Sequence, residues 1–382
     1  MEKETAIENE IRLGGDSSGE QKPHRKRSKK KIALIILLCV LVLLIAGDWA
    51  FSVNIYNENF DKRFESYEPL MLQVDDFEGL ERTKYEFVSD KGQKLTGYLY
   101  STGEEPKKGI IIMAHGLGAG HNSYMDCADY FARHGYLVFA YDATGNDESE
   151  GEGVGGIPQG VIDLDHAISF VEESGNFPDL PIALFGHSWG GYSACAVLTY
   201  HPEVKAVIEC CGCNSSADLV EAGGRDEAGA FLYVIMPFIK LHELIKYGKY
   251  ASNTAMDGFA ASDAAVMVVH SADDGVIPIS YGLDLFQKKY KDDPRFTFMR
   301  LEDRGHNYVF DDTTYIDEFD AGFDEWLASL DYDYSAKENR DRFISDKAAY
   351  IHENLDREKW SHMLDEQMFD RFVALYDEHM TD

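Results

Sequence analysis

The sequence predicts an α/β protein in which helices cover both faces of a mostly parallel sheet and a single apolar helix precedes this domain. Three observations lead to this class. Short, continuously apolar segments, which are typical of buried parallel strands, recur along the chain. Segments with helical periodicity alternate with them. Near the N-terminus, an unbroken apolar run follows a cluster of lysines and arginines.

The alternation of strands and helices extends from residue 82 to residue 330. Continuous apolar strands are expected at residues 109–114, 136–141, 182–185, 204–209, 264–270 and 296–301. Two more strands, at residues 82–88 and 94–100, flank Asp90-Lys91-Gly92, which predicts a hairpin turn. Helical patterns cover residues 123–134, 161–173, 189–200, 279–289 and 314–330. Strands that alternate with helices in this way imply a parallel sheet with helices on both faces.

The apolar run at residues 32–51 is long enough to cross a membrane. As a helix it would extend about 30 Å, which matches the hydrocarbon core of a bilayer. The basic cluster at residues 22–31 is expected to stay in the cytoplasm. We therefore predict a single-pass protein of the cell membrane with a cytoplasmic N-terminus and an extracellular domain. A cleaved signal peptide is the alternative, although the long polar arm and the lack of a small-residue cleavage site before Asp48 argue against it.

The acidic balance of the chain limits its partners. It has 68 acidic and 36 basic residues, and its formal net charge is −32. Nucleic acids attract basic surfaces, so we expect no nucleic-acid partner and interpret the acidity as an aid to solubility. Of six cysteines, Cys210, Cys211 and Cys213 lie close together. Without a second C-x-x-C pair or matching histidines, they are interpreted as small buried residues and not as a metal site, and disulfide pairing is left open.

One pentapeptide carries the strongest functional signal. Gly186-His187-Ser188-Trp189-Gly190 fits G-x-S-x-G and stands between an apolar strand and a helix of small residues. This is the context of a nucleophile elbow, where the serine is exposed on a sharp turn. The flanking glycines let the two backbones approach closely. The sequence therefore predicts Ser188 as a nucleophile, with the N-terminus of the following helix stabilising negative charge.

A serine nucleophile needs a base and an acid. In folds with a nucleophile elbow, the acid follows the serine along the chain and the histidine follows the acid. Two adjacent aspartates follow the strand at residues 264–270, and Asp274, four residues before a proline, is preferred over Asp273. His306 follows the next strand and is the predicted base. The oxyanion is expected to bind the backbone N–H groups of Leu117 and Trp189.

At these residues the chain resembles the α/β-hydrolase superfamily, and in particular its monoacylglycerol lipase-like and serine aminopeptidase-like branch. The resemblance covers roughly residues 80–330 and rests on His115-Gly116-Leu117-Gly118, the elbow, the loop ending at Pro278 and Gly305-His306. The branch also carries D-x-R-G-x-G-x-S-x-G. This chain matches it at residues 142–151, except that Thr144 and Asp147 replace Arg and Gly.

Five regions are predicted from these observations. They are a disordered basic arm (1–31), a transmembrane helix (32–51), a juxtamembrane segment (52–80), an α/β-hydrolase domain (81–330) and a helical acidic extension (331–382). An apolar insertion at about 214–262 is interpreted as a helical cap over the serine, with a peripheral helix pair as the alternative. The apolar positions of the extension are expected to dock on the main body or on a partner.

The sequence thus predicts a membrane-anchored serine hydrolase that acts on lipid-like or small acyl esters without a cofactor or metal. A peptidase that cleaves amides is the alternative. It would need a carboxylate to hold a free amino terminus, and Glu221, Asp226, Glu227 and Glu243 are available. A non-catalytic binding protein is a third interpretation, against which the predicted triad argues.

Overall fold

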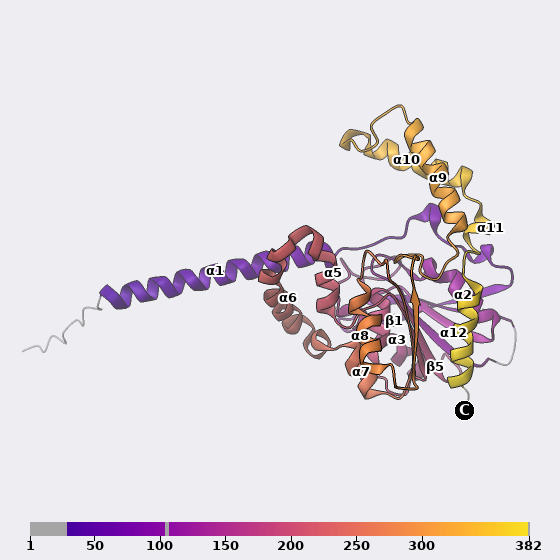
Figure 1. Ribbon diagram of the computed structural model, residues 1–382, viewed down its shortest axis with the longest axis horizontal. Coiled ribbons are helices and arrows are strands. Elements are labelled where there is room, and N and C mark those ends of the chain that lie inside the picture. The colour runs from indigo at the N-terminus through magenta and orange to yellow at the C-terminus, as the bar shows by residue number, and fades with distance from the viewer. Residues whose placement is uncertain (1–28, 104–106, 381–382) are drawn as a thin grey trace, which may run out of the picture. The chain divides into compact units, whose positions relative to one another are not determined.

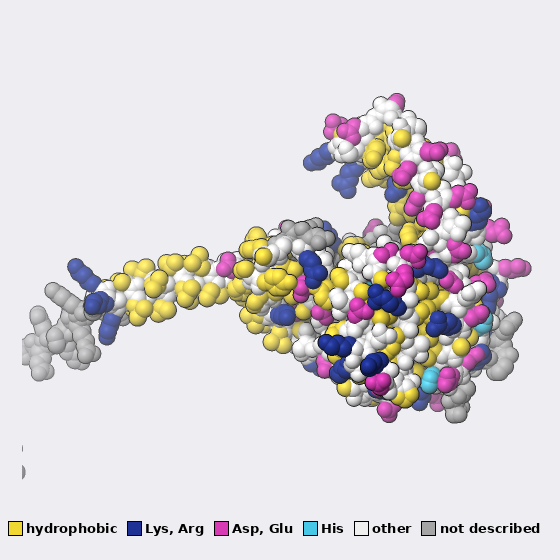
Figure 2. Space-filling model, viewed as in Figure 1, with side chains coloured by type: hydrophobic (Ala, Val, Ile, Leu, Met, Phe, Trp, Pro, Cys, Tyr) yellow, Lys and Arg dark blue, Asp and Glu magenta, His cyan; other side chains and the backbone are white. Residues whose placement is uncertain are grey.

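The computed structural model describes residues 29–103 and 107–380. It forms two units, Met1–Gly47 and Asp48–Asp382. Most of the predicted arm at residues 1–31 lies outside the described residues. Helix α1 (Lys29–Phe60) begins in the first unit and ends in the second. Within the first unit its apolar side chains are exposed (Figure 2). By length and composition α1 could cross a membrane, but a signal sequence near an N-terminus meets the same criteria.

The second unit contains one eight-stranded sheet. Its strands are β1 (Leu80–Val88), β2 (Lys94–Thr102), β3 (Gly109–Ala114), β4 (Tyr136–Tyr141), β5 (Ile182–His187), β6 (Ala206–Cys210), β7 (Ala265–Ser271) and β8 (Phe296–Leu301). Their order is β1-β2-β4-β3-β5-β6-β7-β8. The pairs β1–β2 and β2–β4 are antiparallel, and the other pairs are parallel. The predicted mostly parallel sheet is confirmed.

Helices cover both faces of this sheet (Figure 1). One face carries α2 (Met125–Arg133) and α12 (Glu366–His379), and the other carries α3 (Gln159–Glu173), α4 (Trp189–Ala196) and α8 (Leu283–Tyr290). Alternate side chains of β3 enter separate cores. Ile110 and Ile112 pack on the α4 side, whereas Ile111 and Met113 pack on the α12 side. A strand buried on both faces is continuously apolar, which is why these strands were recognisable from sequence.

The insertion between β6 and β7 contains three helices, α5 (Ser216–Ala228), α6 (Leu232–Tyr247) and α7 (Ala255–Ala261). Helix α7 packs on α4, and α5 packs on α6. One stripe of α6, including Leu232, Ile235 and Ile239, is buried at the three- and four-residue spacing of a helix face. Tyr233, Val234 and other large apolar side chains of α6 are exposed, so this helix is apolar on more than its buried face.

The segments on either side of the sheet and its covering helices are built into the second unit. After α1 ends, Phe64 pairs with Asn146 in the loop that follows β4. The C-terminal region contains α9 (Thr314–Ser329), α10 (Arg340–Asn354), α11 (Arg357–Trp360) and α12. Of the two docking alternatives for the extension, α12 docks on the main body, because Phe369 and Phe372 are fully buried against the sheet side chains.

Candidate active site

Ser188 lies on a strained turn between β5 and α4. Its φ of 57° and ψ of −119° are rare for a residue with a side chain. Both flanking glycines are required sterically. A Cβ on Gly186 would lie 2.3 Å from the Gly190 carbonyl oxygen, and a Cβ on Gly190 would lie 1.9 Å from the Ala114 carbonyl oxygen. Strand and helix therefore approach as closely as the pentapeptide pattern indicated.

The structure brings Ser188, His306 and Asp274 together. The Ser188 Oγ lies 2.9 Å from His306 Nε2, and His306 Nδ1 lies 2.7 Å from Asp274 Oδ2. Because the carboxylate accepts a hydrogen bond, Nδ1 carries the proton and Nε2 is free to accept from the serine hydroxyl. All three side chains are buried. This is the hydrogen-bonding order that a nucleophile, a base and an orienting acid require.

The two competing aspartates have different partners. The other oxygen of Asp274, Oδ1, accepts hydrogen bonds from the N–H groups of Val276 and Ile277, both at 2.8 Å. Asp273 Oδ1 accepts from Ser271 Oγ at 2.6 Å and from Gly305 N at 2.9 Å. Asp273 thus braces the loop that carries His306, and Asp274 contacts the imidazole.

His270, at the end of β7, is a site residue that sequence reasoning missed. Its Nε2 lies 3.1 Å from Asp274 Oδ2 and 2.9 Å from the Ile277 carbonyl oxygen. Burial alone would raise the pKa of Asp274, but hydrogen bonds from His270 and His306 hold that pKa well below its usual range. Asp274 is therefore an anion at neutral pH. The available signal was a histidine on a core strand, four residues before the acid.

His187 connects the loops around the serine. Its Nε2 donates to the His306 carbonyl oxygen at 3.0 Å, and its Nδ1 accepts from the Tyr124 hydroxyl at 2.8 Å. The same hydroxyl accepts from the Gly116 N–H at 3.0 Å. Burial and the adjacent His306 lower the pKa of His187 to about 3, so the ring is neutral. His187 supports the elbow and joins it to two other loops.

The turn that follows β3 carries the predicted oxyanion donor Leu117. His115 braces this turn. Its Nδ1 contacts the Gly116 carbonyl oxygen at 2.8 Å, and its Nε2 accepts from the Ala143 N–H at 2.9 Å. Burial lowers the pKa of His115, which keeps the ring neutral. The Leu117 N–H makes no hydrogen bond to another described residue. The other predicted donor, Trp189, begins α4 directly after the serine.

The two departures from the branch motif have structural roles. Thr144 donates its N–H and its hydroxyl to the buried carboxylate of Asp163, at 2.8 and 3.0 Å. The Asp147 carboxylate accepts from the Ser66 N–H and hydroxyl, both at 2.6 Å. Nearby, Arg63 donates to the carbonyl oxygens of residues 149 and 151. Asp147 therefore fastens the juxtamembrane segment to the loop beside the active site.

The predicted peptidase carboxylates have other partners where they are described. Glu243 is buried and accepts from the Tyr56 hydroxyl at 2.6 Å and the Ser216 hydroxyl at 2.5 Å. Glu221 contacts Arg225 at 3.3 Å and accepts from Tyr233 at 3.0 Å. The side chains of the other two candidates, Asp226 and Glu227, lie outside the described part of the chain.

The cysteines remain thiols. All six cysteines lie in the described residues and none is paired. One of them, Cys211, lies near His270 and Asp274, with ligand atoms within 4.8 Å of one another, a spacing that could hold a metal ion. Burial raises the pKa of the Cys211 thiol, which disfavours the thiolate that a metal would bind. The nitrogen of His270 nearest to Asp274 already donates to a carbonyl oxygen.

The strand order, the elbow after β5 and the loops after β7 and β8 are those of the α/β-hydrolase fold. The family model described as serine aminopeptidase, S33, matches residues 105–272. The resemblance to the monoacylglycerol lipase-like and serine aminopeptidase-like branch is thereby confirmed.

Similar proteins fall in the same branch. Monoglyceride lipase of Rattus norvegicus is 34% identical over 106 residues, which are 27% of this chain and 34% of the relative. Monoacylglycerol lipase of Mycolicibacterium smegmatis is 24% identical over 52% of this chain and 81% of its own. The matched segments span about a third of the length of the mammalian lipases. A Pyrococcus furiosus esterase structure, 16% identical, shares the fold with a TM-score of 0.50 over 70% of this chain and 97% of its own.

Proposed function

We propose that this protein is a membrane-anchored serine hydrolase that cleaves carboxylic esters. The observation that carries the proposal is the continuous hydrogen-bonded series from Ser188 through His306 to Asp274 on a strained elbow. The similarity to hydrolases of the lipase branch supports the reaction class.

In the proposed reaction, Ser188 attacks the ester carbonyl carbon while His306 Nε2 takes the hydroxyl proton. The ester C–O bond then breaks, and His306 returns the proton to the departing alcohol. Water attacks the acyl-enzyme with His306 again as base, which releases the acid and restores the serine. Asp274 keeps the proton on Nδ1 and stabilises the imidazolium in both steps. The backbone N–H groups of Leu117 and Trp189 stabilise the oxyanion, a contribution of about 3 kcal/mol for each donor.

A lipid-like ester is the substrate class that the chain supports best. The insertion between β6 and β7, proposed as a cap, carries an apolar helix with both buried and exposed hydrophobic side chains. Relatives named as monoglyceride and monoacylglycerol lipases support the same class. Proposed anchoring through residues 32–51 of α1 would keep the enzyme at a bilayer, where such esters concentrate.

Amide hydrolysis is the second candidate, and the match to a serine aminopeptidase family favours it. The carboxylate needed to hold a free amino terminus is the discriminating feature. Glu243 already accepts two internal hydrogen bonds, which argues against its use for this purpose. We therefore place ester hydrolysis first.

A fluorophosphonate probe tests the nucleophile. The wild-type chain and the variant Ser252→Ala, which loses an exposed hydroxyl elsewhere, should be labelled. Ser188→Ala should not be labelled, and its ester hydrolysis should fall on the order of 10⁴-fold or more. A panel of monoacylglycerols, short esters and aminoacyl amides then ranks the substrates. Equal labelling of wild type and Ser188→Ala would refute the assignment of Ser188 as the nucleophile. If wild type hydrolysed none of the three substrate groups, a binding protein would be favoured.

A further inference from the structure

The end of α1, residues 48–60, belongs to the second unit and packs against the insertion between β6 and β7 (Figure 1). Tyr56 is fully buried, and its ring centroid lies 5.8 Å from that of His242 on α6. Phe60 lies against α5, where a Cβ on Gly223 would lie 3.3 Å from Phe60 Cζ. A helix that only anchored the chain would need none of these contacts. The end of α1 is therefore part of the folded domain.

The Tyr56 hydroxyl joins the insertion to the loop between β4 and α3. It donates to Glu243 Oε1 of α6 at 2.6 Å and accepts the N–H of Ile157 at 2.9 Å. The carbonyl oxygen of Ile157 in turn accepts the indole N–H of Trp189 at 2.7 Å. The backbone N–H of Trp189 is one of the two predicted oxyanion donors. Two hydrogen bonds in series therefore connect the end of α1 to the residue directly after the nucleophile.

The loop before α3 has a glycine where it meets the chain that leaves α1. Gly156 has a φ of 126°, and a Cβ on it would lie 2.5 Å from Tyr56 Oη. A Cβ on Gly153 would lie 2.2 Å from the Asp61 carbonyl oxygen. The Asp61 side chain also accepts the N–H of Gly155 at 2.6 Å. Because side chains at these positions would collide with the chain leaving α1, the sequence of this loop is fitted to that contact.

The residues that follow α1 reach the turn that carries the second predicted donor, Leu117. A Cβ on Gly118 would lie 3.4 Å from Phe64 Cδ1, so the Phe64 ring covers the residue next to Leu117. The Phe64 N–H donates to the Gly145 carbonyl oxygen at 3.0 Å, and the Phe64 carbonyl oxygen accepts the Asp147 N–H at 3.0 Å. These backbone hydrogen bonds fix the position of the ring.

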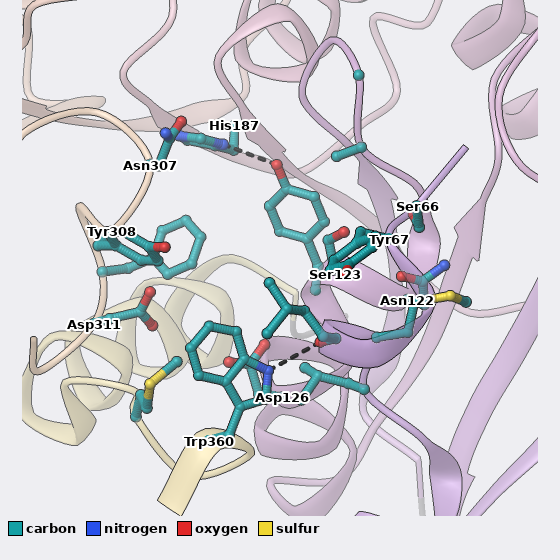
Figure 3. A pocket seen from close by; sticks show the side chains of 18 of the residues that line it. Ser66, Tyr67, Asn122, Ser123, Asp126, His187, Asn307, Tyr308, Asp311 and Trp360 are labelled. Atoms are coloured by element: carbon teal, nitrogen blue, oxygen red, sulfur yellow. Dashed lines mark hydrogen bonds between the residues drawn. The ribbon is translucent and has the colours of Figure 1, made fainter. Parts of the chain in front are cut away.

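The same segment continues past the histidine loop. Ser66 lines a cavity of 430 Å³ together with His187 and Asn307, the residue after His306 (Figure 3). The chain leaving α1 therefore passes the two places that carry the predicted oxyanion donors and then the loop that carries the predicted base.

We propose that the chain leaving α1 is a brace for the proposed oxyanion hole. Within it, Tyr56 positions Trp189 through Ile157. Phe64 positions the turn that carries Leu117. The inference rests on the proposed hydrolysis, because backbone donors stabilise an oxyanion only when they point at it. Tyr56 and Phe64 act through other residues and are positioning residues.

Hydrolysis of p-nitrophenyl butyrate by the detergent-solubilised full chain tests the brace. Tyr56→Phe removes only the hydroxyl, and Phe64→Leu removes the ring but keeps an apolar side chain. The kcat of Tyr56→Phe, counted per chain that the fluorophosphonate probe labels at completion, should fall about tenfold or more, because a small displacement of a donor is costly. Its KM should stay within about twofold of wild type, since the ground state makes little use of these donors. Phe64→Leu should change kcat in the same direction, and it carries the test if Tyr56→Phe fails to fold.

Tyr136→Phe is the matched control. Tyr136 is also fully buried, and its hydroxyl donates to the Asp377 carboxylate at 2.6 Å, the same distance as in the Tyr56 hydrogen bond. It stands at the start of β4, at the end of the sheet opposite the elbow. This variant should keep the kcat and KM of wild type.

Inhibition by octyl trifluoromethyl ketone separates positioning from folding. Ser188 Oγ adds to the ketone carbonyl carbon while His306 takes the hydroxyl proton, and the former carbonyl oxygen becomes an anion in the oxyanion hole. If Tyr56 positions a donor, the inhibition constant should rise by about the factor by which kcat/KM falls. A role in folding alone would lower the fraction of chains that can be labelled, and it would leave both kcat per labelled chain and the inhibition constant unchanged.

Three results would overturn the brace while wild-type hydrolysis, and with it the proposed function, stands. They are a wild-type kcat per labelled chain in either folded variant, an equal loss of kcat in Tyr136→Phe, and a loss of kcat without a change in the inhibition constant of the ketone. Absence of hydrolysis by the wild-type chain would instead refute the proposed function, and this inference with it.

Discussion

Glu209, the penultimate residue of β6, is fully buried below the elbow helix, where its Cγ lies 3.3 Å from the position of a Cβ on Gly191. Burial raises the pKa of Glu209 to about 7. Between about pH 4.5 and pH 7 the unfolded chain therefore loses this proton while the folded chain retains it, and the free energy of unfolding decreases by about 3 kcal/mol. Glu209→Gln should abolish this decrease, as measured by urea unfolding at pH 5 and pH 8.

The exposed Glu173, replaced by Gln, is the matched control and should leave the pH dependence unchanged. The same pH dependence in Glu209→Gln and in wild type would contradict the argument, since the carboxyl would then not be the group that titrates.

At individual residues, sequence reasoning succeeded where a local pattern fixes the backbone. The G-x-S-x-G pattern located Ser188, because both glycines are forced by contacts shorter than any Cβ tolerates. The preference for Asp274 over Asp273 rested only on its spacing from Pro278, since adjacent residues differ in which way the loop turns them. His270 was missed because its role depends on a 3.1 Å approach to Asp274 that no local pattern encodes.

Among the elements, α12 supports the sheet on the face opposite α4. Phe372 is fully buried, with its ring centroid 6.2 Å from that of Phe185 and 4.9 Å from that of Phe369. Phe372→Ala should lower the free energy of unfolding by about 3–5 kcal/mol, because it removes a large buried side chain and leaves a cavity. The exposed Arg371→Ala should change it by less than about 0.5 kcal/mol. Urea unfolding curves that coincide for the two variants would show that α12 does not stabilise the core.

Element prediction depended on how each element is buried. Strands such as β3 and β4 are covered on both faces and therefore read as unbroken apolar runs. Helix α12 has an ordinary amphipathic pattern, and its buried residues indicate a packed face without naming the partner. Along the chain, α9, α10 and α11 separate α12 from β8. The position of α12 on the sheet could therefore be assigned only from the tertiary structure.

For the molecule as a whole, the segment after the apolar helix is part of the folded domain. Asp147 holds Ser66 through two hydrogen bonds, and Phe64 pairs with Asn146. Composition indicated only a juxtamembrane segment at residues 52–80, because a serine such as Ser66 gives no sign in the sequence that it will bond to Asp147. A short connection of this kind ties the proposed anchor to the loops around the candidate site.

Membrane topology is the prediction for the whole chain. Seven lysines and arginines in residues 22–31 precede the apolar run, and such clusters remain in the cytoplasm. Protease added to intact cells should therefore remove the C-terminal domain, while a cytoplasmic marker protein stays intact until the cells are lysed. Replacing the seven basic residues with glutamine should increase the protected fraction, since the charge asymmetry that orients the helix is gone. Full protection of the wild-type domain would place it in the cytoplasm and refute the extracellular assignment.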